Sequence, residues 1–585
     1  MATAKADTGF MHTKDDFRVC PVTSFRIDRS AELLMVGHAV VAILAMALGG
    51  IAALYIGLHK MPADAGFLAV SDADYYKWVE VHGFNMLIFW MVWFEVAAGY
   101  FVATAILNSK LYSTKIGYAA FAIMLIGTLM VEYNILLRAE HNPIMFTAYW
   151  PLSYKEYADT HWSFFLGYIL FAVGTLIAGL NFFGTIWKAQ KTKSYPQKSL
   201  PLVVYGVFVA FVVAVQAILN GAIVFILSWL MSIGVLEPGD VDADFWKQIF
   251  WGFGHTAQYI NIAATAAIWY ALITISTGAK PMNERLSRIA FLFYLFFTIP
   301  VAAHHLIVDP AYSLPFKMIN ATLIALGLAI PSMIHAFVIP GALEKHVRLT
   351  NPDMEKSLFG WIKMLPWKEQ PAIPAVFWSV ALFGIGGILG SIQGTYQLNM
   401  ITHNTLRING HFHLTVVAGS TIAFMGLAYY FIELIPRRKI FFGNLKSLQI
   451  HLYAIGLTLL SIGMFVAGVQ GAPRRTSTYV AYTEVNINWD PGLWMIGIGA
   501  IVAVAGGALF VLLIVSSLFL GERLEREGDF DTQPIPAQNE DEANEKHVGL
   551  EAPGVMVLGV LYMAMFAVFY LLSFLILSLG WDIHR

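Results

Sequence analysis

Residues 409–435 read NGHFHLTVVAGSTIAFMGLAYYFIELI, and this stretch of 27 residues carries one charged side chain, Glu433. A helix of about 20 apolar residues crosses the hydrocarbon core of a bilayer. The stretch is therefore long enough to span a membrane. It begins with two histidines, His411 and His413, and ligand-forming side chains at membrane depth are costly and indicate function.

The rest of the sequence has the same apolar character. Of 585 residues, 58% are hydrophobic and 13% are charged, and the mean hydropathy is +0.64. Soluble domains carry about 25% charged residues, so the sequence indicates a membrane protein. Thirteen candidate spans lie near residues 33–58, 80–107, 113–137, 163–188, 201–234, 245–276, 287–308, 316–341, 372–395, 409–435, 448–470, 493–520 and 552–580.

We therefore predict an all-α membrane protein with about 13 transmembrane helices. No repeat of fixed period and no low-complexity linker divides the spans, so residues 31–585 are predicted to form a single transmembrane domain. Residues 1–30 lack the apolar core of a signal peptide and are predicted to be a retained polar tail. The net charge is −2 and no basic surface is evident, so we expect contact with membrane lipid and none with nucleic acid.

Positive charge gathers on the loops that follow even-numbered spans. These loops contain Lys110, Lys115, Lys188, Lys191, Lys280, Arg285, Arg288, Arg437 and Arg438, among others. The opposite loops are poor in Lys and Arg, and one of them is acidic through Glu237, Asp240, Asp242 and Asp244. By the positive-inside rule the basic loops and the N-terminus are cytoplasmic, and an odd number of spans leaves the C-terminus outside.

The sequence has one cysteine, Cys20, in the polar N-terminal segment. A single cysteine excludes disulfides within the chain, a c-type haem attachment motif and a thiolate copper centre in the apolar part. Any metal in the apolar part must be held mainly by histidine.

His411 and His413 are two positions apart, with Phe412 between them, at the start of their span. On an α-helix this separation directs the two imidazoles about 200° apart. One helix can then provide ligands to two different cofactors on its opposite sides. His82, before Gly83 at the start of the second span, is predicted to lie on the same outer side as His413. These two imidazoles could bind one haem iron axially, with Gly83 allowing close approach of the macrocycle.

The sixth and seventh spans carry the remaining candidates. His255 and Tyr259 are four residues apart and therefore share one helical face. His304 and His305 are adjacent, and on a regular helix they would diverge by about 100°. Sharing one metal then requires a helix end or a distortion, and three imidazoles from two helices would suit copper.

Each histidine taken alone has a simpler explanation, a core side chain that is hydrogen-bonded to a carbonyl group. Two consecutive buried histidines rarely both find such partners. Together the six histidines describe one haem with two imidazole ligands, one haem with a single imidazole ligand and one copper with three. His38, His161 and His451 are predicted to be interfacial or hydrogen-bonded within the bundle.

Further motifs are spread over nearly the whole chain from about residue 27. They are Tyr75-Tyr76, Tyr149-Trp150-Pro151-Leu152, His161-Trp162, Asp309-Pro310, Phe359-Gly360-Trp361-Ile362, Leu365-Pro366-Trp367, His403-Asn404-Thr405 and Pro473-Arg474-Arg475. With the histidines, this series resembles subunit I of the haem-copper oxidase superfamily, and it is most similar to the B-type (ba-type cytochrome c oxidase) branch.

The resemblance implies a role for each matching residue. It assigns His82 and His413 to a low-spin b-type haem, His411 to a high-spin haem of b or a type, and His255, His304 and His305 to one copper ion. Tyr259 matches the tyrosine that becomes joined to the first copper histidine, and Arg474, Arg475 and His403 match residues that bind haem propionates. The resemblance also implies a prokaryotic inner membrane, a cytochrome c-like donor and a second, copper-bearing subunit that receives the electrons.

The proton path is where the sequence departs from the family pattern. Position 257 is Ala, so the glutamate that the A-type branch has between the histidine and the tyrosine is absent. Tyr270, Ser332 and His335 fit the single inward path of the B-type branch. Ala266 and Val338 stand where hydroxyl groups are expected, and Asn399 stands where an aspartate usually lies near the propionates, while Asn409 replaces a proline.

Three functions remain to be weighed. The first is a terminal oxidase that reduces dioxygen to water, possibly with proton translocation, and Tyr259 favours it. The second is a nitric oxide reductase on the same scaffold, for which Glu132 and Glu140 could supply protons, although both are also typical of a solvated rim. The third, a haem-free secondary transporter, explains the spans but not the six histidines.

Overall fold

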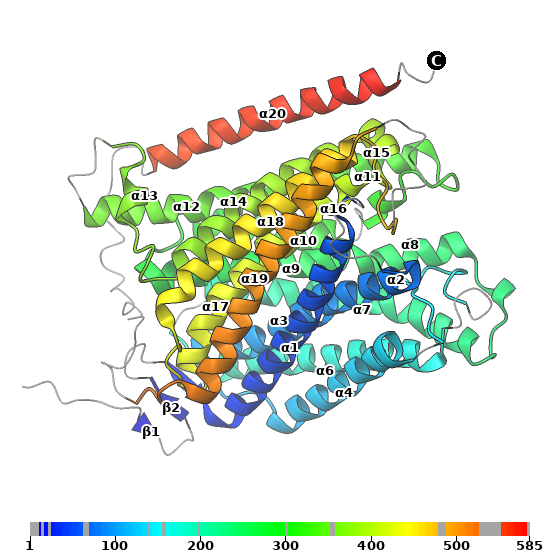
Figure 1. Ribbon diagram of the computed structural model, residues 1–585. Coiled ribbons are helices and arrows are strands. Elements are labelled where there is room, and N and C mark those ends of the chain that lie inside the picture. Colours follow the sequence, from blue (N-terminus) through cyan, green and yellow to red (C-terminus); the bar gives the residue numbers. More distant parts are fainter. Residues whose placement is uncertain are drawn as a thin grey trace, which may run out of the picture.

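The computed structural model describes residues 11–12, 17–20, 25–62, 70–138, 140–154, 160–196, 199–298, 302–351, 357–477, 487–525 and 552–581. The helices form one elongated bundle, and α20 lies along one side of it (Figure 1). The first half of the chain contains α1 (Arg29–His59), α2 (Asp72–Gly83), η2 (Phe84–Phe89), α3 (Trp90–Phe101), η3 (Val102–Ile106), α4 (Thr114–Glu132), η4 (Tyr133–Leu137), α6 (Trp162–Thr192), α7 (Leu202–Ser232), η5 (Pro238–Asp240), α8 (Ala243–Gly254), α9 (Thr256–Thr277) and α10 (Glu284–Phe297). The second half contains η6 (Ala302–Leu306), α11 (Leu314–Ile324), η7 (Ala325–Ala329), α12 (Ile330–Thr350), α13 (Gly360–Met364), α14 (Ala372–Gln393), α15 (Tyr396–Thr402), α16 (Leu406–Phe412), η9 (His413–Ser420), α17 (Thr421–Leu434), η10 (Gly443–Leu445), α18 (Lys446–Val469), α19 (Asp490–Leu520) and α20 (Pro553–Trp581).

Within the described residues, twelve helices are long and apolar enough to cross a membrane. They coincide with twelve of the thirteen predicted spans, so the all-α membrane fold is confirmed. The other predicted span, residues 287–308, is divided between α10 and the short 3₁₀ helix η6, and residues 299–301 within it lie outside the described part.

The most buried spans are those that carry the candidate ligands. Leu406–Leu434 is buried throughout its most apolar window, and Asp72–Ile106 and Ala243–Thr277 follow it. Pro553–Leu575, at the edge of the bundle, has almost no buried residues in its most apolar window. A helix that is apolar on all sides and surrounded by others is suited to hold costly polar groups away from lipid.

The structure also contains a small antiparallel sheet, which the sequence analysis did not predict. It consists of β1 (Met11–His12), β2 (Phe17–Val19) and β3 (Arg26–Asp28), in the order β1-β2-β3. The buried Arg18 donates hydrogen bonds to the carbonyls of Leu434 and Ile435 at 3.2 and 3.1 Å and pairs with Glu32. This contact fixes the described part of the N-terminal segment to the end of α17.

The two ends of the bundle differ in charge, as the loops predicted. We call the end that bears the sheet and the lysine-rich loops the basic end, and the other the acidic end. At the basic end, Lys188 donates to the carbonyl of Leu111 at 3.1 Å. At the acidic end, Lys247 bridges Asp244 and Asp309 at 3.0 and 3.2 Å. All candidate ligands of the metal sites lie nearer the acidic end.

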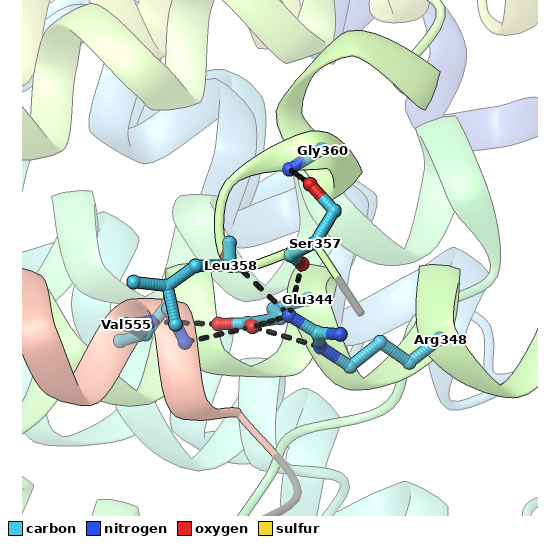
Figure 2. Close-up of polar contacts among 7 residues, drawn as sticks. Glu344, Arg348, Ser357, Leu358, Gly360 and Val555 are labelled. Carbon is cyan, nitrogen blue, oxygen red and sulfur yellow. Dashed lines mark hydrogen bonds and ion pairs between the residues drawn. The ribbon is translucent and has the colours of Figure 1, made fainter. Parts of the chain in front are cut away.

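The last helix is attached to the bundle by a buried carboxylate (Figure 2). Glu344 on α12 accepts hydrogen bonds from the backbone N–H groups of Gly554 and Val555, at 2.9 and 2.7 Å, in the first turn of α20. Arg348 pairs with the same carboxylate at 2.7 Å and also donates to the carbonyl of Ser357 at 3.0 Å. A carboxylate at a helix N-terminus satisfies N–H groups that have no partner within the helix.

Candidate metal centre

A cavity of about 760 Å³ lies between α1, α2, α14, α16, η9, α18 and α19 and extends to the start of α9 and to η6. Its lining contains all six candidate histidines, His82, His255, His304, His305, His411 and His413. It also contains the predicted propionate ligands Arg474, Arg475 and His403. The fold therefore brings together residues from six separate segments of the sequence.

His82 and His413 face each other across this cavity. Their rings are nearly parallel, with an interplanar angle of 7° and centroids 6.3 Å apart. Nδ1 of His82 donates to the carbonyl of Gly49 at 3.0 Å, and Nδ1 of His413 donates to that of Asn409 at 2.8 Å. With the proton on Nδ1, each Nε2 keeps the lone pair that an axial iron ligand needs. Both histidines adjoin π-helical segments, η2 and η9, which often occur at functional sites.

His411 points to the other side of the same helix. Its Nδ1 donates to the carbonyl of Gly386 on α14 at 2.8 Å, whereas His413 faces His82 across the cavity. Gly390, one turn further along α14, lies so close that a Cβ there would overlap the His411 ring. The divergence predicted from the spacing of His411 and His413 is therefore present.

His255, His304 and His305 form a compact cluster. One ligand atom from each residue lies within 4.8 Å of the others. His255 lies where α8 ends and α9 begins. His304 and His305 lie in the short 3₁₀ helix η6. This departure from a regular α-helix is the distortion that two adjacent histidines need in order to share one metal. Trp251 stacks on His305 with centroids 3.6 Å apart and an interplanar angle of 10°. Nδ1 of His255 is buried without a hydrogen-bond partner, as a metal-ligating nitrogen would be in the absence of the ion.

Tyr259 lies beside this cluster. Its ring is 5.4 Å from that of His255, centroid to centroid, at an interplanar angle of 81°. The side chain is fully buried, and its hydroxyl group has no hydrogen-bond partner. A buried hydroxyl group without a partner is costly, so this one is positioned for a proton donor or acceptor that the protein chain does not supply.

Cationic side chains gather where the cavity approaches the acidic end. Arg474 donates to the side chain of Asn404 at 3.2 Å, and among the described residues neither it nor Arg475 pairs with a carboxylate. Arg475 adopts a left-handed backbone, with φ of 61°. His403 lies beside this pair, and burial and the charge of Arg474 lower the pKa of His403 to about 4.

Lys60 is a cavity residue that the sequence analysis missed. It follows α1, lies over the ring of Tyr75 with Nζ 4.7 Å from the centroid, and donates a hydrogen bond to the carbonyl of Thr476. Burial lowers the pKa of Lys60 to about 7. A lysine directly after an apolar span is typical of an ordinary helix end, so nothing in the local sequence identified Lys60 as a cavity residue.

Asn399, noted above for replacing an aspartate, also lines this end of the cavity. Its side-chain oxygen lies 3.3 Å from Nδ1 of His403, and its amide donates to the carbonyl of Gln393 at 3.0 Å. It therefore supports the cavity wall without adding negative charge.

A series of polar side chains leads from Tyr259 towards the basic end. The hydroxyl group of Tyr270 donates to Ser287 at 2.8 Å and lies 3.0 Å from Nδ1 of His335. Tyr294 lies 3.1 Å from Ser332, oxygen to oxygen, and its ring is 5.9 Å from that of Tyr259. We call Tyr259, Tyr294, Ser332, His335, Tyr270 and Ser287 the tyrosine chain. The three residues predicted for the proton path belong to it, whereas Tyr294 and Ser287 on α10 were missed.

The remaining histidines named above are hydrogen-bonded within the bundle. Nδ1 of His38 donates to the carbonyl of Leu34 at 2.8 Å. His161 caps α6 through Ser163, and Nδ1 of His451 accepts a hydrogen bond from Trp378 at 2.8 Å. None of the three lies in the lining of the cavity.

The donor set fits two haems and one copper ion. Three imidazoles have Nδ1 fixed by a carbonyl and Nε2 available, as haem ligation requires. Three others form an all-nitrogen cluster of the kind that copper binds. The arginine pair without carboxylate partners is complementary to propionates.

Comparison with known proteins agrees with this architecture. The family described as cytochrome c and quinol oxidase polypeptide I matches residues 34–502. Subunit 1 of a cytochrome c oxidase from Thermus thermophilus is 29% identical over 414 residues, which cover 70% of this chain and 70% of that protein. Subunit 1 of a quinol oxidase from Bacillus subtilis is 23% identical over 488 residues, covering 79% of this chain and 69% of that protein.

A solved haem-copper terminal oxidase dimer has the same fold. Its chain matches with a TM-score of 0.78 and 24% identity, and the match covers 94% of this chain and 92% of that one. The family match extends over most of the sequence and includes nearly every span described above. The chain therefore belongs to the cytochrome c and quinol oxidase polypeptide I family.

Proposed function

We propose that this chain is the catalytic subunit of a terminal respiratory oxidase that reduces dioxygen to water. The observation that carries the proposal is Tyr259, whose buried hydroxyl group has no partner and whose ring lies against His255 of the three-histidine cluster. Cleavage of dioxygen needs four electrons in quick succession, and a phenol beside the metals can supply one of them with its proton. Coupling of two nitric oxide molecules has no such need.

Six histidines would hold the cofactors. His82 and His413 would bind the low-spin haem, and His411 the high-spin haem. The three-histidine cluster would bind copper. When bound there, these groups would supply the electrons and the place where the oxygen substrate is reduced.

The chain itself would orient the groups and move protons. Arg474, Arg475 and His403 would bind haem propionates, because paired cations offset the cost of carboxylates beside the bilayer core. The tyrosine chain would carry protons from Ser287 near the basic end to Tyr259. Three direct contacts join Tyr270 to Ser287, Tyr270 to His335 and Tyr294 to Ser332, and water would carry the proton over the other steps.

Electrons would come from a cytochrome c-like donor through a second subunit. The only cysteine, Cys20, is buried beside the N-terminal sheet at the basic end, away from the metal centre. This chain therefore has no thiolate ligands for a copper centre that receives electrons. The curated relatives include both cytochrome c oxidases and quinol oxidases. Reduction of the purified complex by cytochrome c and by quinol would identify the donor.

The basic end would face the cytoplasm of a prokaryotic cell, with the C-terminus outside. Single cysteines at Lys191 and Arg288 should then be protected from a membrane-impermeant reagent in intact cells, whereas one at Asp242 should react. The reverse pattern would overturn this orientation.

Turnover of the purified enzyme with each substrate tests the proposal. We expect oxygen to be consumed faster than nitric oxide, and we expect peptide mass analysis to find residues 255 and 259 covalently joined. The sequence leaves nitric oxide reduction as the second candidate, since Val338 and Ala266 remove hydroxyl groups from the proton path. Faster turnover of nitric oxide, together with an unlinked pair, would establish that second function instead.

A further inference from the structure

A second cavity, of about 510 Å³, lies between α3, α6, α7 and α9. Its lining on α9 extends from Ala257, two residues beyond His255, to Ile275 near the basic end. At about 1.5 Å per residue, this length of helix covers most of the hydrocarbon core. The cavity therefore connects the basic end with the level of the metal centre along α9, and it meets the tyrosine chain at Tyr270, which is part of its lining.

Glu95 is the one carboxylate deep in the lining of this cavity. It lies on α3, thirteen residues after His82 in the direction of the basic end, and is 7% exposed. Its Oε1 is buried without a hydrogen-bond partner, and no ion pair to it exists among the described residues. An unpaired carboxylate is too costly in such surroundings, so this group is held as the neutral acid or is hydrated within the cavity.

A polar link joins the second cavity to the metal centre. Asn261 on α9 is 4% exposed and lines the second cavity. Its amide donates to the side-chain oxygen of Gln258 at 3.1 Å, and Gln258 lines the larger cavity that contains the six candidate histidines, which we call the haem cavity. This pair therefore provides a hydrogen-bonded contact between the linings of the two cavities.

The far end of the second cavity opens at the basic end. Its other titratable lining residues are Tyr168, Tyr270 and Tyr430 within the bundle, and Lys280, Glu284 and Arg288 at the end. Lys280 and Glu284 are exposed, so solvent reaches this end. A volume of about 510 Å³ exceeds that of ten waters, each of which occupies about 30 Å³ in the liquid, and because most of the lining is apolar, the polar groups that would hold water there include Glu95, Asn261, Thr175 and the tyrosine hydroxyls.

We propose that Glu95 is a proton carrier on a second inward route, from the basic end through this cavity to Gln258 and the metal centre. The neutral acid passes its proton through water past the amides of Asn261 and Gln258, which orient that water, into the cavity of the metal centre, and the resulting carboxylate regains a proton from water at the Lys280 end. No bond other than O–H is broken or formed. The inference rests on the proposed oxygen reduction, which consumes four protons for each dioxygen, and it gives the protein an acid that the A-type branch places at position 257 instead.

The variant Glu95→Gln in the full complex tests the proposal, with Thr175→Val as its control. Thr175 lines the same cavity and also carries a polar atom, but it is not an acid. We expect Glu95→Gln to slow oxygen turnover about tenfold, Glu95→Asp to restore most of it, and Thr175→Val to change it little. Haem spectra check that each variant is assembled.

Infrared difference spectra give a readout that does not depend on turnover. Reduced-minus-oxidised spectra of the parent should contain a carboxylic acid C=O band that shifts in heavy water and disappears in Glu95→Gln. The variant Asn261→Leu breaks the link to Gln258 while leaving Glu95 intact, so it should slow turnover and keep the band. Because the band is measured without substrate, it tests Glu95 even if the enzyme proves to act on nitric oxide.

Two results would overturn the proposal. One is a difference spectrum that is the same in parent and Glu95→Gln. The other is an unchanged turnover number in Glu95→Gln with a changed KM for oxygen, which would assign the cavity to passage of the gas.

Discussion

The tyrosine chain and the Glu95 cavity approach the metal centre from the same end of the bundle along α9 and share Tyr270, but they are built differently. In the tyrosine chain, three direct contacts join buried hydroxyl and imidazole groups, among them those of Tyr270 with Ser287 and His335 at 2.8 and 3.0 Å. In the Glu95 cavity, a single acid faces open volume and has no such neighbour. The tyrosine chain requires the protein to hold its proton donors in place, whereas the Glu95 cavity requires water.

This difference has consequences for substitution. A chain of direct contacts fails when one member is lost, because a buried partner is left unsatisfied. A hydrated cavity tolerates changes in most of its wall but depends on its acid. The comparison therefore predicts that substitutions at many positions of the tyrosine chain slow turnover, whereas in the cavity it is chiefly substitutions of Glu95 that do so.

The largest effect is expected at the point where the tyrosine chain meets the metal centre. Tyr259→Phe removes the hydroxyl group beside His255 and leaves the ring in place. It should retain the haem and copper spectra and lose oxygen turnover about a hundredfold or more, since both a proton and an electron donor are lost. Oxygen uptake and metal analysis measure this. Full oxygen turnover in the variant would contradict the role of Tyr259 and favour nitric oxide reduction.

The next effect separates the two approaches. His335→Leu interrupts the tyrosine chain beyond Tyr270 and should slow turnover about tenfold. If the two routes serve different steps of one cycle, their delays add, and the double variant with Glu95→Gln should be only about twofold slower than either single variant. If the routes substitute for each other, the double variant should lose far more than both together. Stopped-flow oxygen uptake distinguishes these outcomes.

A smaller effect is expected at the acidic end, beyond both approaches. Lys60→Met removes a buried cation from the haem cavity and should lower the midpoint potential of the low-spin haem by an amount on the order of tens of millivolts. Turnover should change by no more than about twofold. Redox titration of the haem absorbance measures the shift, and Lys77→Met, at a lysine that donates to the carbonyl of Leu136, is the matched control. An unchanged potential would place Lys60 outside the field of the haem.

The smallest effect on turnover is expected at α20, which takes part in neither approach. Glu344→Ala leaves the first turn of α20 and Arg348 without their common partner (Figure 2). It should lower the free energy of unfolding by about 1–3 kcal/mol and leave turnover unchanged. Glu140→Ala removes an exposed partner of Arg138 and should cost less than about 1 kcal/mol. Thermal unfolding, monitored by haem absorbance, compares the two variants. Equal unfolding midpoints for Glu344→Ala and Glu140→Ala would contradict the buried role of Glu344.

The sequence by itself determined the features that depend on local periodicity. Apolar runs of sufficient length marked twelve spans that the structure contains, and loop charge distinguished the two ends of the bundle. The spacing of His411 and His413 determined that they serve opposite sides of one helix. Spacing and membrane depth selected six histidines from the seventeen in the chain, and the resemblance to a family then assigned their roles. These features follow from contacts within a few residues, so a single sequence contains them.

Only the tertiary structure decided which distant residues meet. Nothing local to Tyr294 indicates that it lies between Tyr259 and Ser332, and nothing local to Lys60 places it in the haem cavity. Glu95 reads as one charged residue in an apolar span, and its cavity exists only because α3, α6, α7 and α9 leave space between them. Helix packing in a membrane is set by close contacts between segments far apart in the chain, and apolar periodicity carries little information about which faces come together.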